Sequence, residues 1–278
     1  MTTDGKTSLV TGANSGIGAV TARALAERGD RVILACRSRQ KTQPVIDEIV
    51  AATGNADVEF LELDLADLEQ VRRAAAELHD RTDRIDVLVA NAGLAGQRGQ
   101  TAQGFELQFG VNHLGHFAFI TAVQDLLEAA APSRLVVVAS LSHKGAKHGI
   151  DWDAVQQPTK SVAGYREYEV SKLANVLFAQ EFARRVPADR IWACSLHPGT
   201  VATNVWRRVP WPVSAIMKWR MTPVEEGAKT SIMCATSDEV LEHHGGYFST
   251  GKLSHAGRNA TPELAAELWR RSEAWVAG

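Results

Sequence analysis

Short apolar runs alternate with longer amphipathic ones along the whole chain. The short runs are rich in β-branched residues and lack polar alternation, which predicts strands that are buried on both faces. We expect strands at 8–10, 31–36, 58–63, 85–90, 134–139, 191–196 and, briefly, 247–248. The amphipathic runs predict helices at 16–28, between the second strand and residue 50, at 67–82, 113–130, 168–186 and 224–236, and from 262 onward.

Such alternation predicts an α/β fold, in which helices cover both faces of a doubly wound (Rossmann) parallel sheet of about seven strands. The expected strand order is 3-2-1-4-5-6, with a seventh strand added. No change in composition marks a second domain, so we expect residues 1–278 to form a single domain. Two segments depart from the alternation: an insertion at 143–167 and a stretch rich in tryptophan and proline at 200–222.

The composition is that of an ordinary soluble protein, with 45% apolar and 22% charged residues. A net charge of −2 argues against nucleic acid or an anionic membrane as a partner. Three scattered cysteines, no leader sequence and no apolar run of bilayer length predict a cytoplasmic protein without an integral membrane segment. The histidines show no metal-ligand spacing, so no metal is expected.

A glycine-rich loop, Thr-Gly-Ala-Asn-Ser-Gly-Ile-Gly at 11–18, lies between the first strand and the first helix. Glycine lets the backbone turn tightly and approach a ligand, and the free N–H groups of a helix N-terminus attract phosphate. Gly12, Gly16 and Gly18 therefore predict a cradle for the pyrophosphate of a dinucleotide, although their spacing differs from the general fingerprint. The alternative is an ordinary tight turn.

The residue after the second strand distinguishes the two nicotinamide dinucleotides. An acid there holds the ribose 2′-hydroxyl of NAD, whereas an arginine pairs with the 2′-phosphate of NADP. Here Arg37 follows the strand and the run 34–39 contains no acid, which predicts NADP(H); the alternative is a solvated surface arginine. Asp64, after the third strand, is expected to lie near the adenine or, equally, to cap a local turn.

Tyr168 and Lys172 stand four residues apart, so they share one helix face. A neighbouring ammonium and the positive nicotinamide ring lower the pKa of a phenol, which can then exchange a proton with a substrate oxygen as hydride is transferred. Ser140 directly follows the fifth strand, where ligands bind in open α/β sheets, and is expected to hold that oxygen. Asn112 is expected to hold a water behind Lys172 or to cap a helix, and Asn91 to be a turn residue.

Together these motifs resemble the short-chain dehydrogenase/reductase family over nearly the whole chain, and in detail its retinol dehydrogenase-like branch. The resemblance rests on Thr11–Gly18, Asn91–Gly93, the run Val-Asn-His-Leu-Gly-His-Phe at 111–117, Ser140, Tyr168–Lys172 and Pro198–Gly199. It implies a carbonyl reductase or alcohol dehydrogenase that acts on lipophilic ketones, aldehydes or secondary alcohols. It also implies a catalytic tetrad of Asn112, Ser140, Tyr168 and Lys172.

The remaining site residues expected on these grounds belong to the cofactor or to the substrate. Those for the cofactor are Gly12, Asn14, Ser15, Gly16, Ile17, Gly18, Arg37, Asp64, Leu65, Asn91, Ala92, Gly93, Tyr168, Lys172, Pro198, Gly199, Val201 and Thr203. The substrate is expected at Ser140, with Ser142 as its possible replacement, beneath an apolar lid at 200–222 that includes Trp206, Trp211 and Met217. The alternatives for this lid are packing against the body of the protein and peripheral contact with a membrane.

The alternative to an enzyme is a sensor or scaffold that binds NADP(H) on the same fold without catalysis. Turnover distinguishes the two, because a sensor binds NADPH without oxidising it. Within enzymes, a light-dependent reductase of a pigment precursor shares part of the 112–117 motif, and a bound pigment would reveal it. The resemblance further implies a homodimer or homotetramer that pairs the helices at 113–130 and 168–186.

Overall fold

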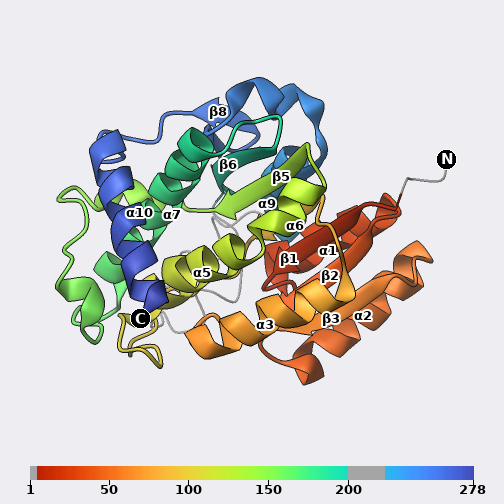
Figure 1. The fold of residues 1–278 in the computed structure, drawn as a ribbon, viewed down its shortest axis with the longest axis horizontal. Coiled ribbons are helices and arrows are strands. Elements are labelled where there is room, and N and C mark those ends of the chain that lie inside the picture. Colours follow the sequence, from red (N-terminus) through yellow and green to blue (C-terminus); the bar gives the residue numbers. More distant parts are fainter. Residues whose placement is uncertain (1–4, 200–222) are drawn as a thin grey trace.

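The computed structural model describes residues 5–199 and 223–278 (Figure 1). These residues form one eight-stranded sheet with the order β3-β2-β1-β4-β5-β6-β7-β8. Neighbouring strands are parallel except for the last pair, β7 and β8. The predicted doubly wound sheet and its strand order are confirmed, with one strand more than expected.

The elements alternate along the chain as the sequence pattern predicts. The strands are β1 (Thr7–Thr11), β2 (Arg31–Cys36), β3 (Val58–Glu62), β4 (Val87–Ala90), β5 (Ser133–Val138), β6 (Ile191–His197), β7 (Tyr247–Ser249) and β8 (Lys252–Ser254). The helices are α1 (Gly16–Glu27), α2 (Arg39–Thr53), α3 (Leu68–Arg81), α4 (Leu107–Phe109), α5 (Gly115–Ala122), α6 (Gln124–Ala129), α7 (Tyr165–Arg185), α9 (Val224–Thr236) and α10 (Pro262–Ala277). Shorter turns are η1 (Gly110–Leu114), η2 (Leu141–Gly145), η3 (Ala154–Gln156) and η5 (Asp238–His243).

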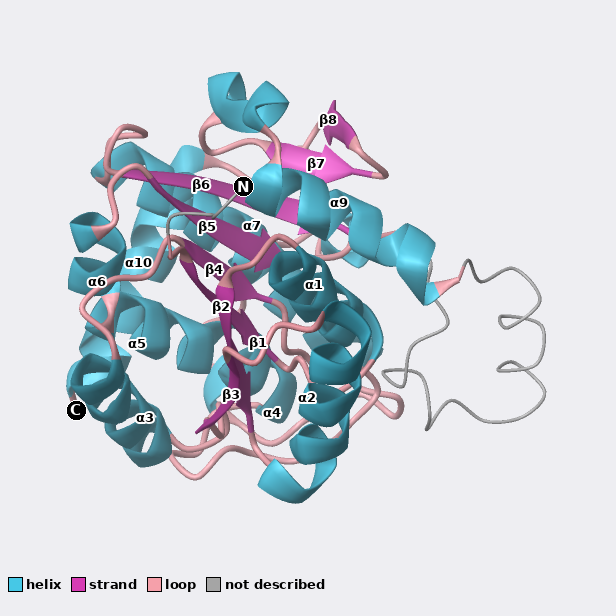
Figure 2. Ribbon diagram, turned by 90° about the vertical axis from the view of Figure 1, so that its right-hand side faces the viewer, coloured by secondary structure: helices cyan, strands magenta, loops and turns pink. Residues whose placement is uncertain are grey.

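In the central strands, such as β1 and β2, alternate residues enter two separate hydrophobic cores. Leu9 and Ile33 belong to the core beneath α3, α5 and α7, whereas Val10 and Leu34 belong to the core beneath α1, α2 and α9. Figure 2 shows α3, α5 and α10 on one side of the sheet and α1, α2 and α9 on the other. Because both faces are covered, the strands need no polar positions.

The C-terminal helix α10 packs across α7 and α5 (Figure 1). The Trp269 ring stacks on Phe178 with 5.7 Å between centroids, and it meets Phe117 edge-on at 5.0 Å. The guanidinium of Arg185 lies 4.5 Å from the centre of the Trp269 ring. Helix α10 thus covers part of the helix pair on which a dimer interface was expected, and the homodimer or homotetramer stays a prediction.

The bounds predicted for the helix at 113–130 are wrong. The helical run begins at Leu107, includes a π-helical turn at Gly110–Leu114, and breaks at Val123 before α6. In the π turn, the Gly115 N–H donates to the carbonyl of Gly110, five residues back. Asn112 therefore lies inside the helical run and is not a helix cap. Such turns are rare and occur frequently at functional sites.

Two further differences concern α7 and β8. Helix α7 begins at Tyr165, three residues before the expected start, because Gly164 takes a left-handed φ of +62° and ends the preceding loop. Strand β8 was not expected, because three residues with exposed or half-exposed side chains make no apolar run. It pairs with β7 across a turn in which Thr250 and Gly251 both have positive φ.

The insertion at 143–167 is held against the loop that precedes α4. The Glu106 N–H donates to the carbonyl of Val155 at 2.8 Å. The buried Glu106 carboxylate accepts hydrogen bonds from the Thr159 hydroxyl at 2.5 Å and from the Phe109 N–H at 2.7 Å. These contacts fix the chain that leads into α7, and therefore the position of that helix.

Membrane-spanning helices and metal-binding clusters are both absent from residues 5–199 and 223–278. Within this part of the chain, no helix has the length and apolar character needed to cross a bilayer. The same residues contain no cluster of three or more histidine, cysteine, aspartate or glutamate side chains that is arranged to hold a metal ion.

Candidate active site

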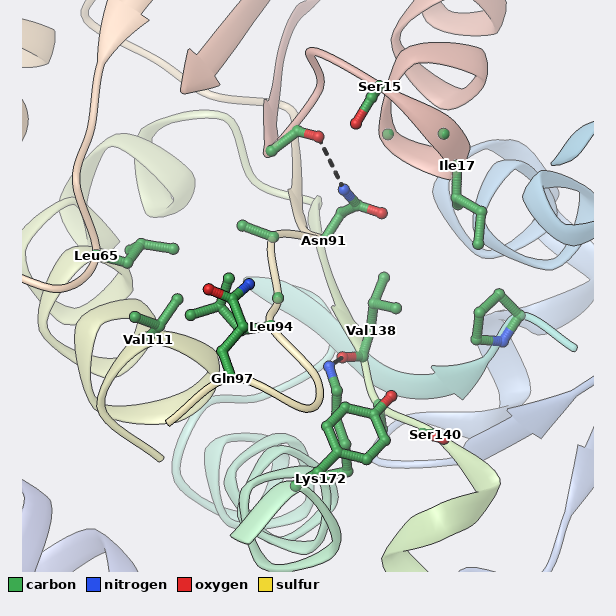
Figure 3. Close-up of a pocket in the computed structure, with 18 of the residues that line it drawn as sticks. Ser15, Ile17, Leu65, Asn91, Leu94, Gln97, Val111, Val138, Ser140 and Lys172 are labelled. Carbon is green, nitrogen blue, oxygen red and sulfur yellow. Dashed lines mark hydrogen bonds between the residues drawn. The ribbon is translucent and has the colours of Figure 1, made fainter. Parts of the chain in front are cut away.

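A cleft of about 850 Å³ lies at the carboxyl ends of strands β1 to β6 (Figure 3). Every described residue that we expected to bind the cofactor lines it, and so do Ser140 and Ser142. Asn112 does not line the cleft. The other expected residues, Val201, Thr203, Trp206, Trp211 and Met217, lie outside the described part of the chain, as does the whole predicted lid.

The glycine loop packs directly against the turn that follows β4. Gly12 has a φ of +65°, and a Cβ there would lie 2.8 Å from the Cα of Ala92. A Cβ on Gly18 would lie 2.5 Å from Asn91 Nδ2, which itself donates to the carbonyl of Thr11 at 2.9 Å. Ser15, the N-cap residue of α1, makes no capping hydrogen bond, so the first N–H groups of this helix are free to bind an anion.

Thr11 and His116 connect this loop to the helical run that contains Asn112. The Thr11 hydroxyl accepts hydrogen bonds from the N–H groups of Asn91 and Ala92, each at 2.9 Å. It therefore donates its own proton to His116 Nε2, also at 2.9 Å, and His116 Nδ1–H donates to the carbonyl of Asn112 at 3.0 Å. Burial lowers the pKa of His116 to about 4, consistent with this neutral tautomer.

Cationic side chains stand at the end of β2, where the 2′-position of a bound dinucleotide is expected. Arg37 and Lys41 both line the cleft and both are exposed. The neighbouring Arg39 is directed elsewhere, since its guanidinium lies 4.7 Å from the centre of the Phe60 ring. The first turn of α2 contains no acidic residue, so no carboxylate there competes for these cations.

Asp64 takes part in a turn and also lines the cleft. Its Oδ1 accepts a hydrogen bond from the N–H of Ala66 at 3.0 Å, which is the predicted turn cap. Because the residue also lies on the cleft wall beside Leu65, both interpretations of Asp64 agree with its position.

Helix α7 carries Tyr168 and Lys172 on the face that closes the cleft (Figure 3). The ammonium nitrogen of Lys172 lies 5.8 Å from the centre of the Tyr168 ring. It donates to the carbonyl of Val138, at the end of β5, at 3.0 Å. Asn175 Nδ2 donates to the same carbonyl, also at 3.0 Å, and so fixes it in place.

Burial shifts both titratable groups toward their neutral forms. It lowers the pKa of Lys172 to about 8 and raises the pKa of Tyr168 to about 12. A hydrogen bond with Ser140 lowers the pKa of the phenol, but burial outweighs it. With this pKa, the phenol of Tyr168 carries its proton at neutral pH. The lowering of the phenol pKa that we expect from Lys172 together with the nicotinamide ring stays a prediction.

The structure distinguishes the two candidate serines. Ser140 is mostly buried and forms a hydrogen bond with Tyr168. Its Oγ also accepts from the N–H of Ser142 at 3.2 Å, so it caps the turn η2. Ser142 Oγ instead lies 3.5 Å from the hydroxyl of Tyr165. Ser140 is thus the serine in contact with the tyrosine, and Ser142 lies farther along the wall.

The side chain of Asn112 is occupied by structural hydrogen bonds. Its Oδ1 accepts from the N–H of Leu94 at 2.7 Å, and its Nδ2 donates to the carbonyl of Leu94 and to Ser171 Oγ, both at 2.9 Å. This amide therefore joins the loop after β4 to α7, directly behind Lys172. The water that we expected Asn112 to hold stays a prediction.

The family follows from comparison with known proteins. A model of the short chain dehydrogenases matches residues 6–211. The chain belongs to the short-chain dehydrogenase family. Its retinol dehydrogenase-like character is also shown: the chain is 38% identical to retinol dehydrogenase 13 of Homo sapiens, over 98% of this chain and 84% of that protein. It is 39% identical to retinol dehydrogenase 11 of Mus musculus, over 95% and 84%.

Solved structures share the fold. A protein from Mycobacterium paratuberculosis is 31% identical, with a TM-score of 0.74 over 98% of this chain and 93% of that one. A short-chain dehydrogenase from Shigella flexneri, complexed with NADP, is 23% identical, with a TM-score of 0.71 over 89% and 97%. The chain is therefore an oxidoreductase of a family whose members bind a nicotinamide cofactor.

Sequence reasoning missed several residues of this short-chain dehydrogenase site. Thr11 and His116 both lie within motifs that the sequence displays, but their contact spans 105 positions. Asn175 follows Lys172 by three residues, a spacing that places it on the same helix face. Tyr165 and Glu169 line the cleft beside Tyr168, and no motif identifies them.

Proposed function

We propose that this protein is an NADP(H)-dependent oxidoreductase that transfers hydride between the nicotinamide and a lipophilic ketone, aldehyde or secondary alcohol. One observation carries the proposal. Tyr168, hydrogen-bonded to Ser140 and adjacent to Lys172, lies on the wall of the same cleft as the glycine loop. Phosphate binding and acid–base chemistry are therefore available within one cavity.

The residues present fit a dinucleotide. The free N–H groups at the start of α1 would hold the pyrophosphate, and Gly12 and Gly18 leave the backbone accessible to it. The Lys172 ammonium, fixed by Val138, would donate a hydrogen bond to the ribose of the nicotinamide. When bound, the nicotinamide supplies hydride in the reductive direction and accepts it in the oxidative direction.

The protein supplies the proton and holds the oxygen. In reduction, the Tyr168 phenol donates its proton to the carbonyl oxygen while the carbonyl carbon gains hydride, which yields the alcohol and a phenolate. The Ser140 hydroxyl, already bonded to Tyr168, hydrogen-bonds the same oxygen. The ammonium of Lys172 stabilises the phenolate. The raised pKa of Tyr168 suits this direction, because the phenol carries its proton before the reaction.

Arg37 supports the choice of NADP(H) over NAD(H). It is a cleft-lining guanidinium immediately after β2, and Lys41, in the first turn of α2, adds a second positive charge to the cleft wall. A guanidinium binds phosphate in a bidentate manner, whereas it offers no acceptor for a ribose hydroxyl. Two proteins with this fold, from Shigella flexneri and Escherichia coli, were solved with NADP and NADPH.

Replacing Tyr168 by phenylalanine tests the function. We expect Tyr168→Phe to lower NADPH-dependent reduction by about 10²–10⁴-fold, because a positioned acid contributes that much. NADPH affinity, measured by fluorescence titration, is expected to persist. Absorbance at 340 nm with a panel of apolar ketones, aldehydes and quinones gives the rate.

Tyr247→Phe is the matched control. The Tyr247 hydroxyl is buried and has no hydrogen-bond partner within the described part of the chain, and it does not line the cleft. Its removal should leave turnover intact. An active Tyr168→Phe enzyme would contradict the mechanism. Tight NADPH binding without turnover of any compound by the wild type would instead support a sensor.

A further inference from the structure

A second ridge of α7 lines the cleft beside the catalytic one. Tyr165 and Glu169 are four residues apart and form this ridge, next to Tyr168 and Lys172. The rings of Tyr165 and Tyr168 lie 6.4 Å apart. Turn η2 lies next to this ridge and also lines the cleft, through Ser142. The hydroxyl of Ser142 lies 3.5 Å from that of Tyr165. Polar groups therefore gather on one side of the reacting centre.

Glu169 is a half-buried carboxylate that lines the cleft. In the described part of the chain no donor lies within hydrogen-bond or ion-pair distance of it. By contrast, Glu167, two residues earlier, accepts hydrogen bonds from the N–H groups of Lys160 and Ser161 and from the Ser161 hydroxyl. The carboxylate of Glu169 instead packs against Gly145 of η2, where a Cβ would overlap it.

Burial and neighbouring charges have opposite effects on the pKa of Glu169. The charges of Arg166 and Lys147 lower the pKa of this carboxyl, yet burial raises it more. Lys144 and His143, on η2, are the other titratable side chains of the opposing turn. A carboxylate that is partly removed from water and lacks a donor is costly for the free protein, and such groups concentrate at functional sites.

We propose that Glu169 is a specificity-determining residue that accepts a hydrogen bond from a hydroxyl group of the substrate, on the side of the reacting carbonyl that faces Tyr165 and Ser142. This inference rests on the proposed function and narrows its substrate class to lipophilic ketones or aldehydes that also carry a hydroxyl. Arg166 and Lys147 already place positive charge near Glu169, so a neutral hydroxyl fits better than a protonated amine. A substrate with an acidic group at this position would be repelled.

Matched substrate pairs test the inference. Each pair is a ketone and its hydroxylated analogue, for example acetophenone with 2-hydroxyacetophenone and 4-phenylbutan-2-one with 4-(3-hydroxyphenyl)butan-2-one. For at least one pair, wild-type kcat/KM should favour the hydroxylated member by about tenfold or more, as expected for a hydrogen bond to a charged acceptor. Reduction is followed at 340 nm with saturating NADPH.

Three variants assign this preference to Glu169. Glu169→Gln keeps the shape but offers only a neutral acceptor, so the ratio should fall severalfold. Glu169→Met offers no such acceptor, so the ratio should approach one. Gly145→Ala displaces the carboxylate without changing it and should also lower the ratio. Glu48→Gln, on the exposed face of α2, removes the same charge far from the cleft and should leave the ratio unchanged.

The outcomes separate the inference from the proposed function. NADPH affinity should be equal in all variants, which shows that each one folds. If the wild type reduces the ketones without preferring the hydroxylated members, or if Glu169→Met keeps the preference, the role of Glu169 is overturned and the reductase remains. If the wild type binds NADPH but reduces no member of any pair, the proposed function fails and the inference fails with it.

Discussion

Burial decides the protonation of the residues at the centre of the cleft. Tyr168 and Lys172 are almost completely inaccessible to solvent, and burial moves their pKa values in opposite directions, to about 12 and about 8. The sequence displays the pair but not its burial, so the rise in the phenol pKa that burial causes could not be predicted from the sequence. Two glutamates of α7 also differ in their surroundings. Glu167 accepts three hydrogen bonds, whereas Glu169 accepts none within the described part of the chain.

Arg37 provides a test of cofactor choice at the scale of one residue. We expect Arg37→Gln to weaken NADPH binding by about tenfold and to leave NADH binding unchanged, because only NADPH offers a phosphate to the guanidinium. Fluorescence titration with each nucleotide measures both affinities. The effect should shrink at high salt, since Arg37 is exposed.

Arg39→Gln is the control for Arg37. It removes the same charge two residues away, from a side chain that packs on Phe60 and does not line the cleft. The NADPH preference should survive this change. A wild-type protein that binds NADH as tightly as NADPH would contradict the proposed cofactor.

At the scale of elements, the site depends on contacts between segments that are far apart in the sequence. The helical run from Leu107 to Ala129 was expected as a single helix from 113, but its π turn places Asn112 against both Leu94 and Ser171. Periodicity could not reveal this, because a π turn is a single short turn inside an otherwise α-helical run. Strand β8 likewise depends on its pairing with β7, because its three residues are too few and too polar to be evident from the sequence.

Thr11 tests the connection between the glycine loop and the helical run. Thr11→Val removes a hydroxyl that accepts from two N–H groups and donates to His116. Because these buried groups would be left without partners, we expect the free energy of unfolding to fall by about 2–4 kcal/mol. Urea denaturation measures the loss, and NADPH affinity should fall too.

Thr11→Ser distinguishes the contribution of the Thr11 hydroxyl to stability from that of its methyl group. It retains every hydrogen bond of Thr11 and removes one buried methyl, so it should cost only about 1 kcal/mol. If Thr11→Val were no less stable than Thr11→Ser, the hydroxyl network would not hold the loop.

At the scale of the whole molecule, α10 joins the two helices nearest the site. His113 lies in the core between α10, the helical run and α7, with its Nε2 3.0 Å from Ser272 Oγ. Its ring lies 5.2 Å from Phe109 and 6.1 Å from Phe178. Helix α10 therefore reduces the surface of these helices that is open to another copy of the chain.

Buried histidines make the whole fold sensitive to acid. Burial lowers the pKa of His113 to about 3 and of His116 to about 4, whereas both titrate near 6.5 when unfolded. Below 6.5 the unfolded chain binds more protons than the native one, so stability present above that pH is lost as the pH falls toward 4. At pH 5 we expect a loss of about 2 kcal/mol for each histidine, relative to pH 7.5.

Urea unfolding at the two pH values measures this loss. His113→Gln keeps a hydrogen-bonding side chain toward Ser272 but cannot be protonated, so its stability should depend less on pH. The control is His148→Gln, at an exposed position in the insertion, which should retain the wild-type dependence. Equal acid sensitivity in wild type and His113→Gln would show that His113 does not cause it.

The sequence by itself determined the sheet, its strand order and the main parts of the site. Strand and helix patterns repeat over a few residues, so they can be read from the sequence. Several site residues lie at a predictable end of an element: the glycine loop, Arg37, Ser140 and the Tyr168–Lys172 pair. Only the tertiary structure decided which of these groups meet, which are buried and which remain without partners. The Thr11–His116 contact, the bonding of Asn112, the coverage by α10 and the lack of a partner for the Glu169 carboxylate among residues 5–199 and 223–278 all depend on packing between distant segments. Local pattern carries no information about such packing.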